Sequence, residues 1–122
     1  MKVLLGVGGS EDSLTALERT VERSRAAGDD LTIALVENPQ TDADQADLES
    51  TVRDVLADAD FDADVRRIEG DAGSRLVDVA EAEGFDLVVL GGGERSPMGK
   101  INLGQIAQFV LLNSPVSVKL VR

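Results

Sequence analysis

Glycines near the C-terminus have the types and spacing to bind an anion. An apolar run, Leu87–Leu90, leads directly into Gly91, Gly92 and Gly93. Glycines let the backbone turn sharply and leave its N–H groups uncovered. Gly104 opens a predicted helix, whose first amide groups have no acceptor inside the helix. Two sets of free donors, one after a strand and one at a helix N-terminus, form a cradle for an anion such as phosphate.

Glu94 lies in the same stretch and opposes such a cradle. A unit charge about 4 Å from a phosphate costs about 1 kcal/mol in bulk water and about 4 kcal/mol at the effective dielectric near a protein surface. The larger cost weakens binding roughly a thousandfold. Arg95, Lys100 and Gln105 offer donors that offset part of this repulsion. Glu94 could instead share a Mg²⁺ ion with the phosphates, but a lone carboxylate is weak evidence for a metal site, so we expect none.

The same residues also have a simpler interpretation. Gly91–Gly93 turn the chain after a buried strand, which is common, and Gly104 caps a helix. Arg95 and Lys100 are more often solvated loop charges than ligands. For this motif taken alone, the simpler interpretation is preferred.

The chain contains no His and no Cys. Thiolate catalysis, disulfides and Cys-based metal sites are excluded, and the commonest general base is missing. Only carboxylates remain for acid–base chemistry, so an enzyme acting on some other anion is the weakest alternative. We expect a binding protein without catalysis.

The net charge of −11 and the aromatic share of 2% exclude further classes. A duplex-binding protein needs a basic surface, and a single-strand binder needs aromatic side chains for stacking, so we expect no nucleic-acid partner. No apolar run is long enough to span a bilayer and Met1-Lys2 leads directly into a strand, so we expect a soluble, cytoplasmic protein. Acidic residues number 23, and the only Lys residues are Lys2, Lys100 and Lys119. Molar salt would screen the self-repulsion of such a surface, which favours a halophilic archaeal source over an acidic mesophilic one.

Strands and helices alternate along the whole chain, which predicts one domain over residues 1–122. The pattern favours an α/β fold, a single doubly wound five-stranded parallel sheet with helices on both faces. Ligands of such sheets bind at the carboxyl ends of the strands, where the strand order reverses. The expected strands are Lys2–Val7, Leu31–Val36, Ala63–Ile68, Leu87–Leu90 and Val116–Val121, and the expected helices lie around Leu14–Arg25, Ala46–Ala59, Leu76–Ala80 and Gly104–Leu112.

Three features together resemble the universal stress protein family. The first strand ends in the turn Val7-Gly8-Gly9-Ser10, and Gly70-Asp71 precedes the third predicted helix. Over Asp86–Val121 the order is strand, Gly, loop, Gly, helix, Pro and strand. The resemblance covers the whole chain and implies a five-stranded parallel α/β fold. It also implies a homodimer through the last strand, Val116–Val121, whose alternating apolar residues would otherwise leave an unprotected edge.

One branch of that family binds ATP and another does not. The binding branch carries Gly, two residues, Gly, nine residues, then Gly followed by Ser or Thr. Gly91 and Gly104 keep this spacing, but Glu94 replaces the middle glycine and Gln105 replaces the hydroxyl residue. Gly8 occupies the position where binding members usually carry an Asp. The resemblance therefore implies a stress-response dimer with a degenerate nucleotide site, which binds ATP weakly or not at all and acts through protein interactions.

The alternative implied by the resemblance is a genuine ATP- or AMP-binding member, in which any ATP hydrolysis would be slow because no residue is placed to act as a base. Adenosine would then lie against Val7–Ser10 and Val36, and phosphates would lie at Gly91–Arg95 and Gly104–Ile106. The candidate crevice comprises Val7, Gly8, Gly9, Ser10, Val36, Leu90, Gly91, Gly92, Gly93, Glu94, Arg95, Gly104, Gln105 and Ile106.

Overall fold

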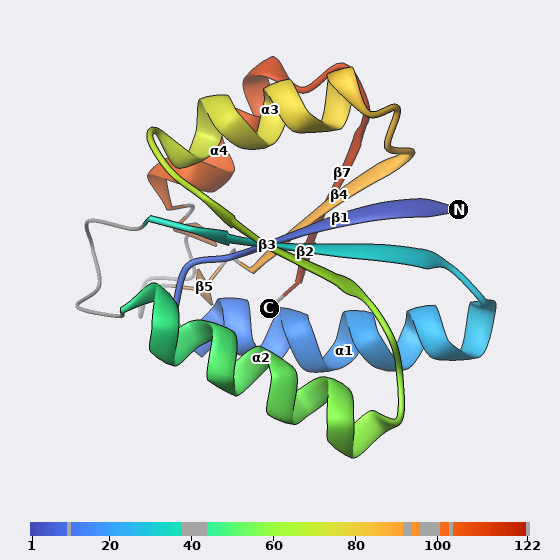
Figure 1. The fold of residues 1–122 in the computed structure, drawn as a ribbon. Coiled ribbons are helices and arrows are strands. Elements are labelled where there is room, and N and C mark those ends of the chain that lie inside the picture. The colour runs from blue at the N-terminus through green and yellow to red at the C-terminus, as the bar shows by residue number, and fades with distance from the viewer. Residues whose placement is uncertain (10, 38–43, 92–93, 96–100, 103, 122) are drawn as a thin grey trace.

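The computed structural model describes residues 1–9, 11–37, 44–91, 94–95, 101–102 and 104–121. Five parallel strands form one sheet in the order β3-β2-β1-β4-β7, with β1 at its centre (Figure 1). This sheet confirms the predicted α/β class. The strands are β1 (Lys2–Val7), β2 (Asp30–Val36), β3 (Asp64–Ile68), β4 (Leu87–Gly91) and β7 (Ser117–Val121).

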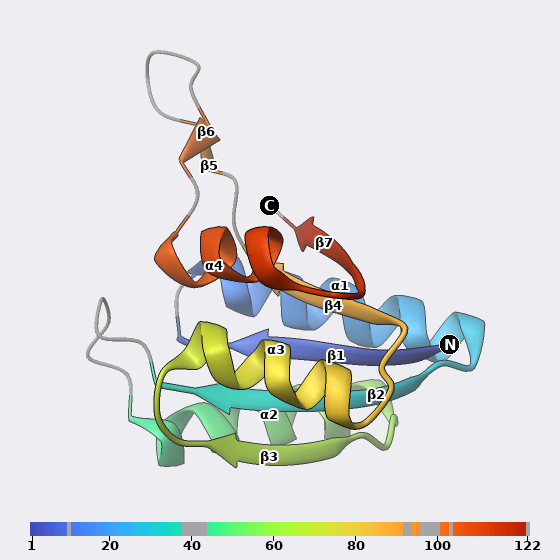
Figure 2. The same ribbon diagram turned by 90° about the horizontal axis from the view of Figure 1, so that it is seen from above.

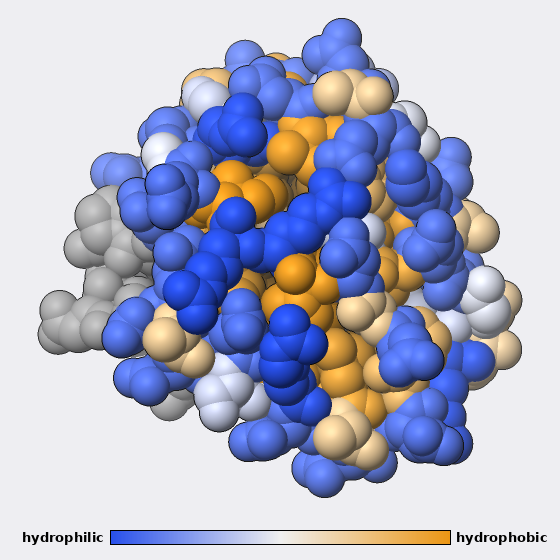
Figure 3. Space-filling view, viewed as in Figure 1, coloured by the Kyte–Doolittle hydropathy of each residue, from blue (hydrophilic) through white to orange (hydrophobic). Residues whose placement is uncertain are grey.

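Two helices cover each face of the sheet, as predicted for a doubly wound fold. Helices α1 (Glu11–Ala27) and α2 (Gln45–Ala59) lie on one face, and α3 (Ala72–Ala82) and α4 (Gln105–Asn113) lie on the other (Figure 1). Hydrophilic side chains cover most of the face in Figure 3, and apolar side chains show between them. No helix in the described part of the chain is long and apolar enough to cross a membrane.

The sheet separates two apolar cores, because successive side chains of a strand point to opposite faces. Leu5 and Val7 of β1 pack with Leu17 of α1 on one face. Leu4 packs with Leu76 of α3 on the other. Burial of both faces explains why β1 and β2 read as continuous apolar runs in the sequence.

Side-chain caps fix where two of the helices begin. The Asp44 carboxylate accepts a hydrogen bond from the Ala46 amide at 3.0 Å, and the Asp71 carboxylate accepts one from the Ser74 amide at 3.0 Å. Such caps satisfy amides that have no acceptor within the helix. The hydrogen bonds from Ser74 also lower the pKa of Asp71 below its ordinary value.

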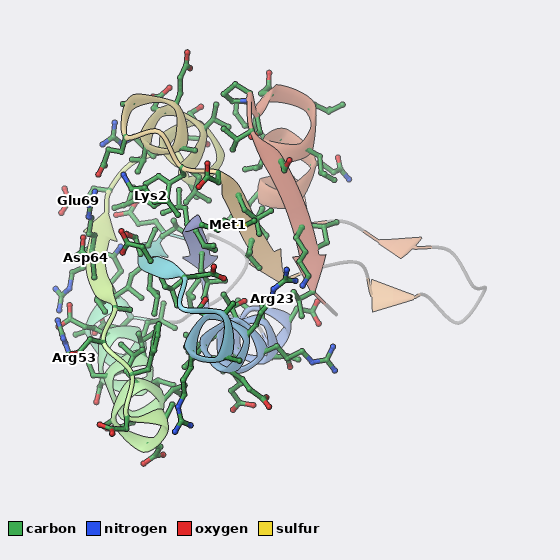
Figure 4. The ribbon with its side chains drawn as sticks, turned by 90° about the vertical axis from the view of Figure 1, so that its right-hand side faces the viewer. Met1, Lys2, Arg23, Arg53, Asp64 and Glu69 are labelled. Atoms are coloured by element: carbon green, nitrogen blue, oxygen red, sulfur yellow. The ribbon has the colours of Figure 1, made fainter. Side chains whose placement is uncertain are left out.

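The segment between β4 and α4 differs from the loop that the sequence predicts. Two short strands, β5 (Glu94–Arg95) and β6 (Ile101–Asn102), pair antiparallel in a second sheet. They lie outside the helix and sheet layers, to the side of β7 (Figures 2 and 4). Strands of two residues are too short to show any alternation of apolar and polar residues, so the sequence pattern could not reveal them.

Candidate functional site

The strand order reverses between β1 and β4 at the carboxyl edge of the sheet. β1 pairs with β2 on one side and with β4 on the other, and Gly6 lies opposite Leu90. The connections after β1 and β4 lead to helices on opposite faces, which is the arrangement that leaves a crevice for a ligand. The predicted position of the candidate site is therefore at this edge, between the ends of these two strands.

Three apolar residues of the predicted site lie at this edge but belong to the core. Val7 and Val36 end their strands, Leu90 precedes the last residue of β4, and each is at most 4% exposed. Val7 packs in the core on the α1 side of the sheet, whereas Val36 and Leu90 pack in the core on the α3 side. They form a floor beneath the edge and offer little surface to an adenine ring.

The turn after β1 depends on a glycine conformation. Gly8 is buried, and Gly9 has a φ of 88°, in the left-handed region that side chains rarely adopt. α1 then begins at Glu11. Ser10, which completes the predicted turn, lies outside the described residues, as do Gly92 and Gly93.

Gly91 has a packing role that the sequence does not reveal. A Cβ atom built on Gly91 would lie 2.3 Å from the carbonyl carbon and oxygen of Asp12 and 2.5 Å from the amide nitrogen of Ser13. These are backbone atoms of the first turn of α1, which cannot yield as a flexible side chain can. The close approach of α1 to the end of β4 therefore requires glycine at position 91, whether or not a ligand binds there.

At the N-terminus of α4, in contrast to Gly91, packing does not require a glycine. Gly104 is the N-cap, with φ −67° and ψ 161°, and it makes no side-chain cap hydrogen bond. A Cβ built there would meet no described atom within 4 Å. The Gln108 amide donates to the Gly104 carbonyl at 3.0 Å, so the amides of Gln105, Ile106 and Ala107 precede the first helical hydrogen bond. Conformation and packing do not require a glycine at this position, and the helix end keeps its donors.

The carbonyl groups at the end of the neighbouring strand pair are already occupied. The side-chain amide of Gln45, the first residue of α2, donates to the Leu35 carbonyl at 3.0 Å and to the Ile68 carbonyl at 3.3 Å. This amide ties together the ends of β2 and β3. Gln45 is not among the predicted site residues, because an isolated glutamine at a helix start carries no signal of this contact.

Glu94 and Arg95 form β5, and their backbones pair with Asn102 and Ile101. Their side chains, together with Lys100, lie outside the described part of the structure. The effect of the Glu94 charge on a bound phosphate therefore stays a prediction. Among the described residues, no group of three or more His, Cys, Asp or Glu side chains could hold a metal ion.

The sequence matches the model of the universal stress protein family over residues 1–122. The fold is similar to a universal stress protein from Archaeoglobus fulgidus, with 19% identity, a TM-score of 0.78 and coverage of 100% of this chain and 98% of that chain. UspA from Lactobacillus plantarum gives 18% identity, a TM-score of 0.78 and coverage of 100% and 97%. A universal stress protein solved in complex with cAMP gives 24% identity, a TM-score of 0.73 and coverage of 100% and 96%. No curated protein sequence matches this chain. At these identities the solved structures establish the fold alone.

Proposed function

The chain belongs to the universal stress protein family, and from that premise we propose that it acts by binding and carries a degenerate nucleotide site. On this proposal its affinity for ATP is weak, with a dissociation constant above about 10 μM. Its role in the stress response then depends on contacts with other proteins. The chain has neither His nor Cys, which supports a role without catalysis.

The contact between Gly91 and α1 is the observation that carries this proposal. Gly91 is one of two glycines that keep the spacing of a nucleotide motif, and the packing of Asp12 and Ser13 is sufficient reason for it. Its presence is therefore no evidence for a ligand. Gly8 is buried and brings no carboxylate to the crevice. Glu94 adds a negative charge to the segment where phosphate would have to bind.

The alternative is a genuine nucleotide-binding member, and one observation favours it. The N-terminus of α4 presents free amides behind Gly104, a glycine that packing does not explain. Similar structures were solved with cAMP, with dAMP and with AMP. In this alternative the amides of Gln105 and Ile106 would donate to a phosphate, aided by the partial positive charge of the helix end.

Calorimetric titration of ATP–Mg²⁺ into the protein in molar KCl tests the proposal. The proposal predicts a dissociation constant above about 10 μM, or no heat of binding. Tighter binding would contradict it and establish the alternative. Titration with AMP in the same buffer shows whether any affinity depends on the additional phosphates.

We also propose that two copies pair through β7, the strand at the open edge of the sheet. Val118 and Leu120 are half-buried on one face of β7, and Leu112 on the preceding helix is 84% exposed. An antiparallel pair centred on Val118 would place Lys119 opposite Ser117 of the second copy. A pair centred on Lys119 would instead set two like charges opposite each other, which is destabilising. The first register is therefore the one we expect.

Composition supports the proposal that the protein works in concentrated salt. The protein has a net charge of −11 over 122 residues. Repulsion of this size destabilises a compact state in dilute buffer and is screened within about 3 Å at 1 M salt. A halophilic archaeal source is proposed on the same ground, and a cytoplasmic location is proposed from membership of the family.

A further inference from the structure

A hollow of about 420 Å³ opens beside β7, on the face of the sheet that α1 covers. Its floor consists of apolar side chains from β1, β4 and β7. Thr20 and Ser24 line it from α1. The described residues around this hollow include none of the candidate nucleotide crevice, so it is a separate feature of the molecule. The floor residues are Val3, Leu87, Val89 and Val121.

Three cationic side chains surround this floor. Arg19 and Arg23 lie one helical turn apart on α1, and Lys119 lies on β7. Figure 4 shows Arg23 between α1 and the edge strand. All three residues are exposed, and within the described part of the chain none of them forms an ion pair or a hydrogen bond.

At the opposite edge of the sheet, the cationic side chains form ion pairs. At β3, Arg66 contacts Asp64 at 2.7 Å and Glu83 at 2.5 Å, and Arg67 contacts Glu49 at 3.3 Å. With nearly twice as many acidic as basic residues, the chain has carboxylates available for every cation. Three unpaired cations around one apolar hollow therefore distinguish this edge of the sheet from the β3 edge, although Arg75 of α3 is likewise without an ion pair among the described residues.

One carboxylate lines the hollow, but its charge is already engaged. Asp29 lies 3.5 Å from the N-terminal ammonium group, and its side chain is only 11% exposed. It leaves the three cations without a partner. Arg25 is also unpaired among the described residues, but it lines a different hollow with Glu18, Glu22 and Asp58.

We infer that this hollow binds a slender amphipathic anion, an unbranched acyl chain that ends in a carboxylate. The volume lies within the range of small-ligand sites, and an apolar floor with a few polar groups at its rim is their usual composition. Val3 and Val89 are only 2% exposed, so the deepest part of the floor is closely covered by its neighbours, and a thin, flexible chain suits it better than the side of a helix. Arg19, Arg23 and Lys119 would form charge-assisted hydrogen bonds with the carboxylate. The inference is independent of whether ATP binds at the other site.

Calorimetric titration with octanoate tests this inference, at the lowest KCl concentration at which circular dichroism shows the chain folded. We expect saturable binding with one octanoate per chain. Butyrate should bind more than about tenfold more weakly, since it loses four methylene groups from the apolar floor. Octanol, which has the chain without the charge, should bind at least about fivefold more weakly.

Variants separate this site from a general attraction of anions. Arg23→Gln and Lys119→Gln should each weaken octanoate binding about fivefold. Arg25→Gln on the same helix is the matched control and should leave it unchanged. Thr20→Leu should reduce binding by filling the hollow while thermal unfolding shows that the fold is kept.

Several results would overturn the inference. They are absence of saturable octanoate binding, equal affinity for butyrate or octanol, and equal loss in the Arg25→Gln and Arg23→Gln variants. A short oligoglutamate peptide that binds more tightly than octanoate and displaces it would also overturn the inference, and would point to an acidic protein segment instead.

Discussion

Gly91 at the end of β4 lies directly against the backbone of Asp12 in the first turn of α1. A Cβ atom on Gly91 would come within 2.3 Å of the Asp12 carbonyl group. The contact joins the end of a central strand to the start of the longest helix. It gives a reason for this glycine that does not involve a ligand.

Replacement of Gly91 should therefore destabilise the fold itself. We expect Gly91→Ala to lower the free energy of unfolding by about 1–3 kcal/mol, because α1 must move to admit the methyl group. Gly104→Ala is the matched control, since its Cβ meets open space and its φ of −67° suits any residue. The control should cost less than about 1 kcal/mol, the usual range for an exposed N-cap change.

Urea denaturation in molar KCl measures both variants. Equal losses of stability in the two would contradict the packing role of Gly91. A loss in Gly91→Ala that disappears when ATP is omitted from the buffer would also contradict it, because the contact with Asp12 is present without ligand.

Acid should weaken the ion-pair cluster at the β3 edge. The hydrogen bond from Arg66 lowers the pKa of Glu83 below its ordinary value of 4.5. In turn, the hydrogen bonds to Glu83 and Asp64 raise the pKa of Arg66. A carboxylate with a lowered folded-state pKa stabilises the fold above its unfolded-state pKa, and that stability is lost as the pH falls through the folded-state pKa. We therefore expect the urea concentration at the midpoint of unfolding to decrease when the pH is lowered below about 4.5.

Glu83→Gln should reduce that acid dependence, as measured by urea midpoints on both sides of pH 4.5. Asp54→Asn on the exposed face of α2 is the control, and it should leave the pH profile unchanged. An identical profile for wild type and Glu83→Gln would show that the contact with Arg66 contributes nothing.

The proposed dimer is sensitive to charge at the centre of β7. Val118→Arg would set two guanidinium groups opposite each other across the pair, so we expect a monomer by light scattering in molar KCl. Val65→Arg changes the same residue type on β3, at the other edge of the sheet, and should leave the dimer intact. A wild-type monomer would contradict the proposal, as would a dimer that survives Val118→Arg.

Salt should stabilise the protein by screening its own charge. We expect the thermal midpoint to rise between dilute buffer and molar KCl, because like charges repel less at a Debye length of about 3 Å. Sucrose of equal osmolality is the control, since it strengthens apolar burial without screening. A midpoint that is unchanged or lower in KCl would count against adaptation to high salt.

The predictable part of this molecule is the part with a repeating pattern. Buried runs such as Lys2–Val7 and the helical spacing of Leu14, Leu17 and Val21 gave the parallel sheet and its helices, with boundaries that differ by a few residues at most. The contact of Gly91 with Asp12 was not predictable, because it joins residues that are distant in the sequence. The contacts of the Gln45 amide with β2 and β3 were not predictable either, since a single polar residue forms no periodic pattern in the sequence.

The central claim is that the nucleotide site is degenerate because of charge and bulk at position 94. Parallel calorimetric titrations of ATP–Mg²⁺ into wild type, Glu94→Gln, Glu94→Gly and the control Asp54→Asn test it most directly. We predict weak or undetectable binding by wild type and by Asp54→Asn, stronger binding by Glu94→Gln and the strongest by Glu94→Gly. Wild-type binding tighter than about 10 μM, or no gain in either Glu94 variant, would contradict the claim.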